Sequence, residues 1–315
     1  MTDDLRERLA AVRTEVGKAV VGQEAAVSGL IVALLARGHV LLEGVPGVAK
    51  TLLVRSLSAS LALATTRVQF TPALMPGDVT GSTVFDAGTG RFDFRPGPVF
   101  TNLLLADEIN RTPPKTQSAL LEAMEERQVT VDGVSRPLPD PFLVAATQNP
   151  VEYEGTYTLP EAQLDRFLMK IVLDLPAREQ EVEVLVRHAG GFDPSDLSAL
   201  RPQLTPEQLR AARAAVQEVR ASGDVLGYVV DLVRGTRSAP SVQLGVSPRG
   251  AAALLAASRA WAWLRGAPAL TPDHVQDMAL PVLRHRIRLR PEAELEGVSV
   301  DAVLRSVIAT VQVPL

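Results

Sequence analysis

The residues with the clearest chemical potential form a glycine-containing turn between an apolar run and a helical pattern. The turn reads Gly44-Val45-Pro46-Gly47-Val48-Ala49-Lys50-Thr51. Glycines let the backbone fold around phosphate groups with its N–H groups pointing inward, and the following helix N-terminus adds partial positive charge. In such a loop Lys50 would reach the β- and γ-phosphates, and the Thr51 hydroxyl would bind Mg²⁺. Ala49 stands where the strict motif has glycine, so a plain glycine turn that caps a helix is the alternative.

A second candidate is a pair of adjacent acids. The apolar run Leu103-Leu104-Leu105-Ala106 ends in Asp107 and Glu108. In phosphoryl transfer an aspartate at a strand end holds the metal ion, and a neighbouring glutamate can activate water as a general base. A strand that simply ends in solvated acids is the alternative. The phosphate-loop pattern upstream favours the functional interpretation.

A polar pair also follows the next apolar run, residues 142–147, which ends in Gln148 and Asn149. A polar side chain at the tip of a strand beside the loop could contact the γ-phosphate or position the attacking water. Taken alone, an asparagine before Pro150 is more often a turn former.

Two arginines complete the set of candidates. Arg166 precedes the last apolar run of the first half, where a surface ion pair with Asp165 or Glu161 is the simpler interpretation. Arg249 lies in the first turn of a predicted helix. A cation is unfavourable at that end of the helix dipole, so a nearby anion would explain it better.

These residues need a parallel sheet to bring them together. Up to Leu175, short apolar runs alternate with helical patterns, which is typical of a parallel sheet with crossover helices. The predicted strands are 39–43, 66–70, 102–106, 142–147 and 170–173, with helices at 23–36, 50–62 and 116–126. Hairpins are predicted within 71–98 and around the turn Asp132-Gly133.

After Leu175 the strand patterns stop. Helical patterns follow at 206–221, 226–236, 248–265, 272–289 and 299–311. We therefore predict the α/β fold class: a five-stranded parallel core in residues 1–190 and an all-helical domain in residues 191–315.

Composition limits the function classes. The chain has 315 residues, no cysteine, 46% apolar residues and a formal net charge of −4. We expect a cytoplasmic globular protein, because the charged N-terminus does not fit a signal peptide and no apolar run is long enough for a membrane span. The acidic balance makes nucleic acid an improbable partner. The dense basic stretch 284–290 could touch an acidic partner, but we expect it to satisfy the carbonyls at a helix C-terminus.

Together these motifs resemble the AAA+ ATPases, and specifically the MoxR family. The stretch 105–125 is similar to that family's Walker B segment and following helix, and 146–150 to its sensor 1. The stretch 157–167 is similar to its arginine-finger segment. The resemblance covers essentially the whole chain, and this family commonly has alanine before the Walker lysine.

The resemblance implies a role for each matching position. Lys50 and Thr51 would bind phosphates and Mg²⁺, Asp107 the metal and Glu108 the water. Asn149 would be sensor 1, Arg166 the finger supplied to a neighbouring subunit, and Arg249 sensor 2. The expected nucleotide contacts are Val21, Gly22, Gly44, Val45, Pro46, Gly47, Val48, Ala49, Lys50, Thr51 and Leu52. The segment 71–98 resembles the family's helix-2 insertion, and the Asp132-Gly133 hairpin its pre-sensor-1 insertion.

The resulting hypothesis is a ring-forming ATPase that uses ATP and Mg²⁺ to remodel a partner protein. The family implies a homo-oligomeric ring, expected to be a hexamer, and a partner such as a separate von Willebrand factor A-domain protein or another client. A DNA-directed motor and a nucleotide-gated binding module with little turnover are the alternatives.

Overall fold

The centre of the chain is a parallel sheet with five strands. A computed structural model describes residues 2–88, 90–149 and 156–314. The strands are β1 (Val40–Glu43), β2 (Thr65–Gln69), β5 (Leu103–Asp107), β8 (Leu143–Gln148) and β9 (Met169–Val172). Their order across the sheet is β2-β5-β8-β1-β9. The five predicted strands are confirmed to within one residue at each end. Thr89 and Pro150, which the sequence placed in a hairpin turn and in the sensor motif, lie outside the described residues.

The strands alternate their side chains between two hydrophobic layers. Leu103 and Leu105 pack with α1 (Thr2–Ala19), α2 (Glu24–Leu35) and α3 (Lys50–Ser60). Leu104 and Ala106 pack on the other side with α5 (Pro114–Glu126). Both faces are therefore covered, which explains why β5 and β8 are apolar runs without polar alternation.

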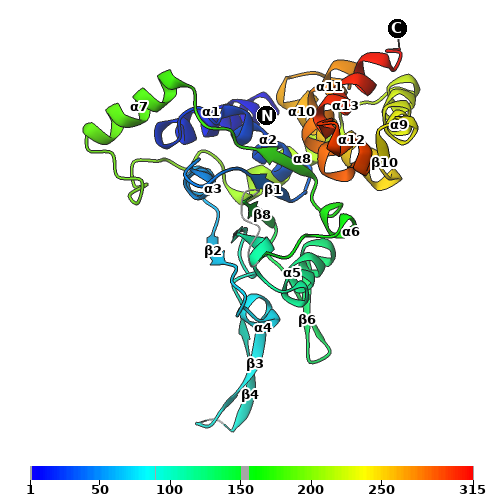
Figure 1. Cartoon of the computed structure of the whole chain (residues 1–315). Helices are drawn as coiled ribbons and strands as arrows, with labels where there is room; N and C mark the ends of the chain where they lie inside the picture. The colour runs from blue at the N-terminus through cyan, green and yellow to red at the C-terminus, as the bar shows by residue number, and fades with distance from the viewer. Residues whose placement is uncertain (1, 89, 150–155, 315) are drawn as a thin grey trace.

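Two hairpins project from the same end of the core (Figure 1). The longer one pairs β3 (Gly81–Asp86) with β4 (Arg91–Pro96) and follows the short helix α4 (Pro76–Thr80). The shorter one pairs β6 (Gln128–Val131) with β7 (Val134–Pro137). Its turn residues, Asp132 and Gly133, have φ of 53° and 76°, as a two-residue turn between antiparallel strands requires. Both predicted hairpins are confirmed.

The C-terminal part is mostly helical and lies beside the core (Figure 1). Its helices are α8 (Pro206–Gln217), α9 (Gly223–Ser238), α10 (Pro248–Leu264), α11 (Pro272–Leu283), α12 (Pro291–Leu295) and α13 (Val300–Thr310). Because one hydrophobic cluster joins α1 to α13, packing does not separate two units at residue 190, and that boundary stays a prediction. Within the described ranges, no helix combines the length and apolarity needed to cross a membrane.

The prediction of an all-helical domain with a helix over 272–289 needs correction. The helix α11 ends at Leu283, and the chain turns through the 3₁₀ segment η2 (Arg284–Arg286). It then enters β11 (Arg288–Leu289), which pairs antiparallel with β10 (Val242–Leu244). The basic stretch thus leaves the helix because its side chains and backbone have partners elsewhere.

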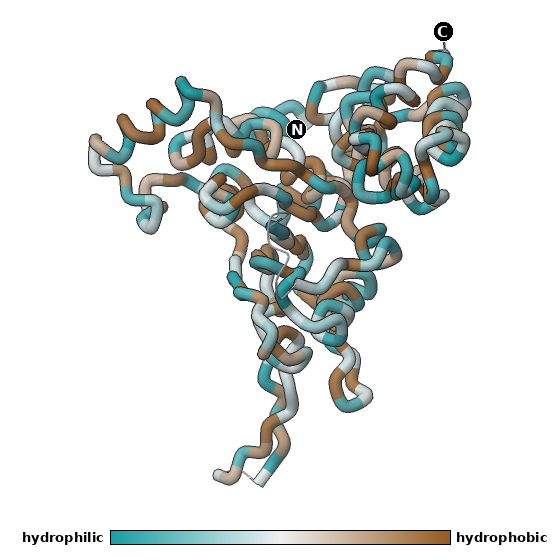
Figure 2. Tube along the Cα trace, in the orientation of Figure 1, coloured by the Kyte–Doolittle hydropathy of each residue, from teal (hydrophilic) through white to brown (hydrophobic). Residues whose placement is uncertain are grey.

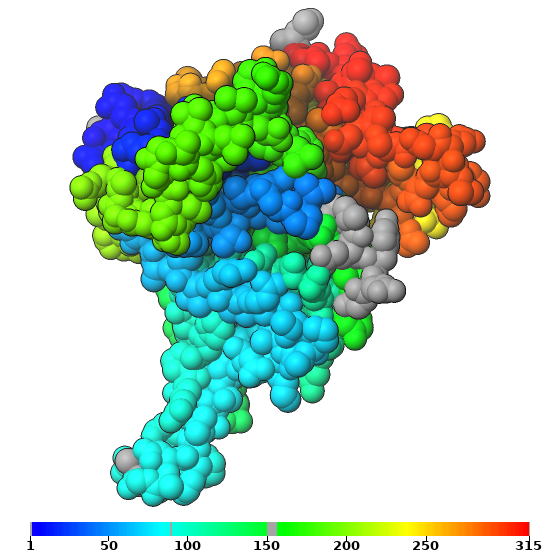
Figure 3. Space-filling model, turned by 60° about the vertical axis from the view of Figure 1, so that its left-hand side comes forward, coloured from blue at the N-terminus to red at the C-terminus, as the bar shows by residue number. Residues whose placement is uncertain are grey.

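Two long helices were not predicted. In α1 the buried Leu5, Leu9, Val12 and Val16 recur at helical spacing, a signal that could have revealed this helix. The other is α7 (Arg178–Ala189), which has no buried residue and lies on the surface near the N-terminal helices (Figure 3). Hydrophobic residues on α7 face solvent (Figure 2), including Leu185 with 68% of its surface exposed. Because α7 packs on no core, its burial pattern could not have predicted it.

His39, directly before β1, is a buried polar residue that joins layers of the core. Its Nδ1 accepts a hydrogen bond from the Val144 N–H at 2.9 Å, and its Nε2 lies 3.1 Å from the Met124 carbonyl oxygen. Burial, with a smaller contribution from the charge of Arg127, lowers the pKa of His39 from 6.5 to about 3. The imidazole is therefore neutral, with Nε2–H donating to α5.

The low pKa of His39 predicts a specific loss of stability in mild acid. Between the unfolded pKa near 6.5 and the folded value of about 3, the unfolded chain binds a proton that the folded chain does not. Stability should therefore fall as pH decreases below 6.5, and His39 should contribute about 1.4 kcal/mol per pH unit to that slope. Urea unfolding at pH 7, 6, 5.5 and 5 should give a shallower slope for His39→Gln than for the parent. Equal slopes would show that His39 is protonated in the folded state.

Candidate nucleotide-binding site

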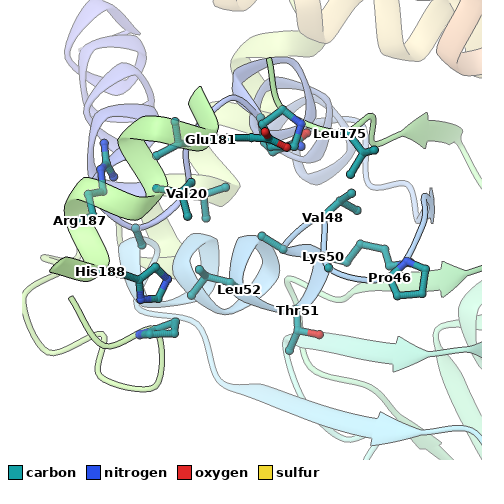
Figure 4. A pocket seen from close by; sticks show the side chains of 18 of the residues that line it. Val20, Pro46, Val48, Lys50, Thr51, Leu52, Leu175, Glu181, Arg187 and His188 are labelled. Carbon is teal, nitrogen blue, oxygen red and sulfur yellow. The ribbon is translucent and has the colours of Figure 1, made fainter. Parts of the chain in front are cut away.

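The candidate site lies at the carboxyl edge of the sheet, where three neighbouring strands end. Because β8 lies between β5 and β1, Asp107, Asn149 and the loop after β1 meet at this edge. A pocket of about 780 Å³ opens there, and Figure 4 shows part of its lining. The predicted residues that line it are Val21, Pro46, Gly47, Val48, Ala49, Lys50, Thr51, Leu52, Asp107, Glu108 and Asn149. Ligands of open parallel sheets bind in this kind of crevice.

The loop has the backbone conformation that a phosphate-binding turn needs. Gly47 has φ of 89°, and Ala49, which precedes α3, has φ of 61°. A left-handed conformation at a residue with a Cβ costs roughly 1 kcal/mol or more, so alanine keeps the required turn at the expense of strain. The Lys50 Nζ donates to the Gly44 carbonyl at 2.6 Å, which draws its ammonium group back across the loop. Gly44 and Val45 shape the turn but do not line the pocket.

Asp107 is buried at the end of β5 with both carboxylate oxygens engaged. Its Oδ1 accepts a hydrogen bond from the Thr147 hydroxyl at 2.5 Å, and its Oδ2 accepts one from the Arg67 guanidinium at 2.8 Å. The Asp107 carboxylate and the Thr51 hydroxyl both line the pocket, and such oxygen donors are the ligands that Mg²⁺ prefers. The donor set therefore fits the expected metal ion.

Glu108 is held by different partners. Its backbone is left-handed, with φ of 57°, and its N–H donates to the Thr147 hydroxyl at 2.8 Å. The carboxylate Oε2 accepts a hydrogen bond from Gln69 at 2.6 Å and pairs with Arg111 at 3.2 Å. Strained backbone conformations of this kind cluster at functional sites. The two carboxylates thus point to separate partners, as a metal ligand and a base must.

Sequence reasoning missed the residues that hold these acids. Arg67 and Gln69 are on one face of the edge strand β2, and Gln69 lies opposite Asp107 in the strand pairing. Thr147 is fully buried in β8. Only the strand order, which the sequence does not specify, brings these three side chains to the carboxylates.

The outer wall of the pocket was also unexpected. It is formed by Leu175, Pro176, Glu181, Val184, Leu185, Arg187, His188, Phe192 and Pro194, mostly from α7 and its flanking turns. In Figure 4 Glu181, Arg187 and His188 lie across the pocket from the loop. The Arg187 guanidinium donates to the carbonyls of Gly17 and Lys18 at 2.9 and 2.8 Å, which ties α7 to the end of α1. Gly22 lies outside the lining, close to the side chain of Gln180.

The two predicted arginines are not in this pocket. The Arg166 Nε lies 3.1 Å from the Glu125 Oε2, and the Arg249 Nη1 lies 3.0 Å from the Glu125 Oε1. Arg166 lines a separate hollow at the end of α5, together with Glu122 and Glu126. Arg166 and Arg249 are therefore neighbours of one carboxylate, away from the Lys50 loop of their own chain.

Comparisons with known proteins agree with this geometry. The family described as ATPases associated with various cellular activities (AAA) matches residues 39–169, and the AAA lid domain matches residues 234–307. The chain is 48% identical to the protein YeaC of Bacillus subtilis, covering 99% of this chain and 97% of that protein. It is 43% identical to the Chaperone MoxR1 of Mycobacterium tuberculosis, covering 95% and 81%. A crystal structure of a proposed ATPase from Cytophaga hutchinsonii has 39% identity and a TM-score of 0.91, covering 100% and 97%.

Replacing Lys50 by alanine should abolish ATP binding, because it removes the loop's cation from the phosphates. Titration calorimetry with ATP and Mg²⁺ measures the affinity of the folded variant. Lys115→Ala is a matched control, since Lys115 is an exposed residue outside the pocket, and it should bind as the parent does. ATP affinity that is unchanged in Lys50→Ala would exclude the loop as the phosphate site.

Proposed function

The chain belongs to the MoxR family of AAA ATPases, a membership that implies ATP hydrolysis, and we propose that this hydrolysis takes place between the subunits of a ring. One observation carries the proposal: Arg166 and Arg249 lie together on Glu125, outside the pocket of their own chain. A phosphoryl-transfer site gains greatly from a guanidinium that neutralises charge on the transferred group. A neighbouring subunit would supply it here.

Within one subunit, the residues divide the work by position. The loop N–H groups and Lys50 would hold the phosphates of ATP, and Asn149 would contact the γ-phosphate side. Asp107 and Thr51 would hold Mg²⁺, which when bound neutralises charge on the phosphate oxygens. Glu108 would take the proton of the attacking water once its carboxylate leaves Gln69.

The two arginines would act across the subunit interface. In the single chain, Glu125 supplies the anion that pairs with both guanidiniums. In a ring, the γ-phosphate of the neighbour's ATP would take over that role, so Arg166 and Arg249 would serve as finger and sensor 2 in trans. The lining of the pocket supports this arrangement, because among the described residues it ends at Pro194, before the first helix of the lid.

Coupling to a partner protein is the remaining part of the proposal. The names of two relatives, Chaperone MoxR1 and the magnesium-chelatase 38 kDa subunit of Cereibacter sphaeroides, support a remodelling role. We propose a hexameric ring in the cytoplasm that acts on a separate client or von Willebrand factor A-domain protein. The core comprises residues 1–190 and the lid residues 191–315 in this proposal.

Replacing Glu108 by glutamine should separate binding from chemistry. The amide keeps the size of the side chain but cannot accept a proton, so hydrolysis should fall by about 10²–10⁴-fold while ATP binding persists. Phosphate release measures the rate, and calorimetry measures the binding. A variant that hydrolyses ATP at the parental rate would mean that another group activates the water. A parent that binds ATP without turnover would instead support a nucleotide-gated binding module.

Mixing two inactive variants should restore activity if the site is shared between subunits. Arg166→Ala keeps the Lys50 loop, and Lys50→Ala keeps the arginine, so a mixed ring contains some complete sites. A finger in trans contributes about 10³–10⁵-fold where it has been isolated, so the recovery should be measurable. Arg305→Ala, which removes an exposed lid arginine paired with Asp301 at 3.8 Å, is the control and should be active alone. Mixed rings, verified by size, that stay inactive would rule out the shared site.

A further inference from the structure

The basic stretch after α11 does not form a surface for an acidic partner. Its central residue, Arg286, is buried, with only 3% of its side chain exposed. The Arg286 Nε lies 2.6 Å from the Oδ1 of Asp165, the residue directly before Arg166. A buried guanidinium of the lid therefore holds the segment of the core that carries the proposed finger.

The contact extends to the backbone of that segment. Arg286 donates from Nη2 to the Phe167 carbonyl at 2.7 Å and from Nη1 to the Leu168 carbonyl at 3.1 Å. His285 is also buried, and its Nε2 lies 2.7 Å from the Arg286 Nη1. Burial, and the charge of Arg286, lower the pKa of His285 well below 6.5, so a neutral imidazole stands beside the guanidinium. Two consecutive lid residues thus surround residues 165–168.

A second lid element meets the same carboxylate. Ser247 caps α10 by accepting the Gly250 N–H, and its hydroxyl lies 3.3 Å from the other oxygen of Asp165. Arg249 follows two residues later in the first turn of α10. At the rim, Arg288 pairs with Glu161 of the short helix α6 (Glu161–Leu164) at 2.9 Å, where α6 lies between α5 and the lid (Figure 1).

The Asp165 carboxylate therefore joins three elements at one point. Arg166 follows it in the chain, Arg249 is next to its Ser247 partner, and both arginines reach Glu125. A buried ion pair contributes little net stability but is costly to break, so its main effect is to fix geometry. Chemistry across an interface needs such fixed geometry, because a shift of about 1 Å can reduce a rate by about 100-fold.

We propose that Arg286 and Asp165 are positioning residues that hold Arg166 and Arg249 in one rigid body with the lid. The inference rests on the proposed trans role of the two arginines. It assigns the lid a second task beyond movement: it sets the position of the arginines that its own subunit delivers to the neighbour's ATP. The basic stretch of the sequence acquires its function from this contact.

Arg286→Lys is the variant to test, because lysine keeps the charge but cannot form the several fixed hydrogen bonds of a guanidinium. It is placed in the subunit that donates the arginine, as Lys50→Ala/Arg286→Lys, and mixed with Arg166→Ala. The recovered ATPase activity should fall about tenfold or more compared with the Lys50→Ala donor. In the opposite placement, Arg166→Ala/Arg286→Lys mixed with Lys50→Ala, recovery should be unchanged, because that subunit only holds ATP.

Arg284→Lys is the matched control in the donor. Arg284 belongs to the same basic stretch and pairs with Asp301 at 2.8 Å inside the lid, with no recorded bond to residues 161–168. It should leave recovery unchanged. A loss with Arg286→Lys in both placements would mean general damage to the fold, and no loss in either would mean that the clamp does not position the arginines. Both outcomes overturn the inference.

Hydrogen exchange provides a readout independent of activity. The amides of residues 161–168 should exchange faster in Arg286→Lys and at the parental rate in Arg284→Lys. Unchanged exchange in Arg286→Lys would overturn the clamp even if activity fell. If the simple mixture of Lys50→Ala and Arg166→Ala shows no recovery, the shared site itself is wrong, and that failure is distinct from the failure of the clamp.

Discussion

The position of β8 between β1 and β5 is the constraint on which the rest of the structure depends. Parallel strands end at the same edge of a sheet, so this order places the loop of β1, the acids of β5 and the polar end of β8 side by side. No two of these three strands are adjacent in the chain. The apolar character of β5 and β8 makes the order stable, because both strands are covered on both faces and fit only in the interior of the sheet.

The carboxylates at this edge are already engaged before any ligand is considered. Thr147 contacts both acids, through the side chain of Asp107 and the backbone of Glu108. The edge strand β2 then distinguishes them, since Arg67 pairs with Asp107 and Gln69 with Glu108. A cation beside the aspartate favours the metal-binding role, and an amide on the glutamate holds the base away until it is needed. The chemistry of the pair is therefore set by neighbours as much as by the acids.

The proposed catalytic groups are divided between two surfaces of each subunit. One surface carries the loop and the acids under α7, and the other carries Arg166 and Arg249 on Glu125. Such a chain can bind its substrate alone but needs a second copy to complete the reaction. The lid is attached to the second surface through Asp165 and Arg286, so its position is linked to the neighbour's site.

Local patterns were sufficient to predict much of this protein. Apolar runs, turns and the motif around Lys50 gave the five core strands to within a residue, both hairpins and most residues of the pocket, because these features depend on a few consecutive side chains. Pairing between distant segments was not predictable: Gln69 reaches Glu108 only through strand order, and Arg286 reaches Asp165 only through docking of the lid. The surface helix α7 left no burial pattern to read. Short-range propensity is written in neighbouring residues, whereas contacts across more than a hundred residues are decided when the hydrophobic layers pack.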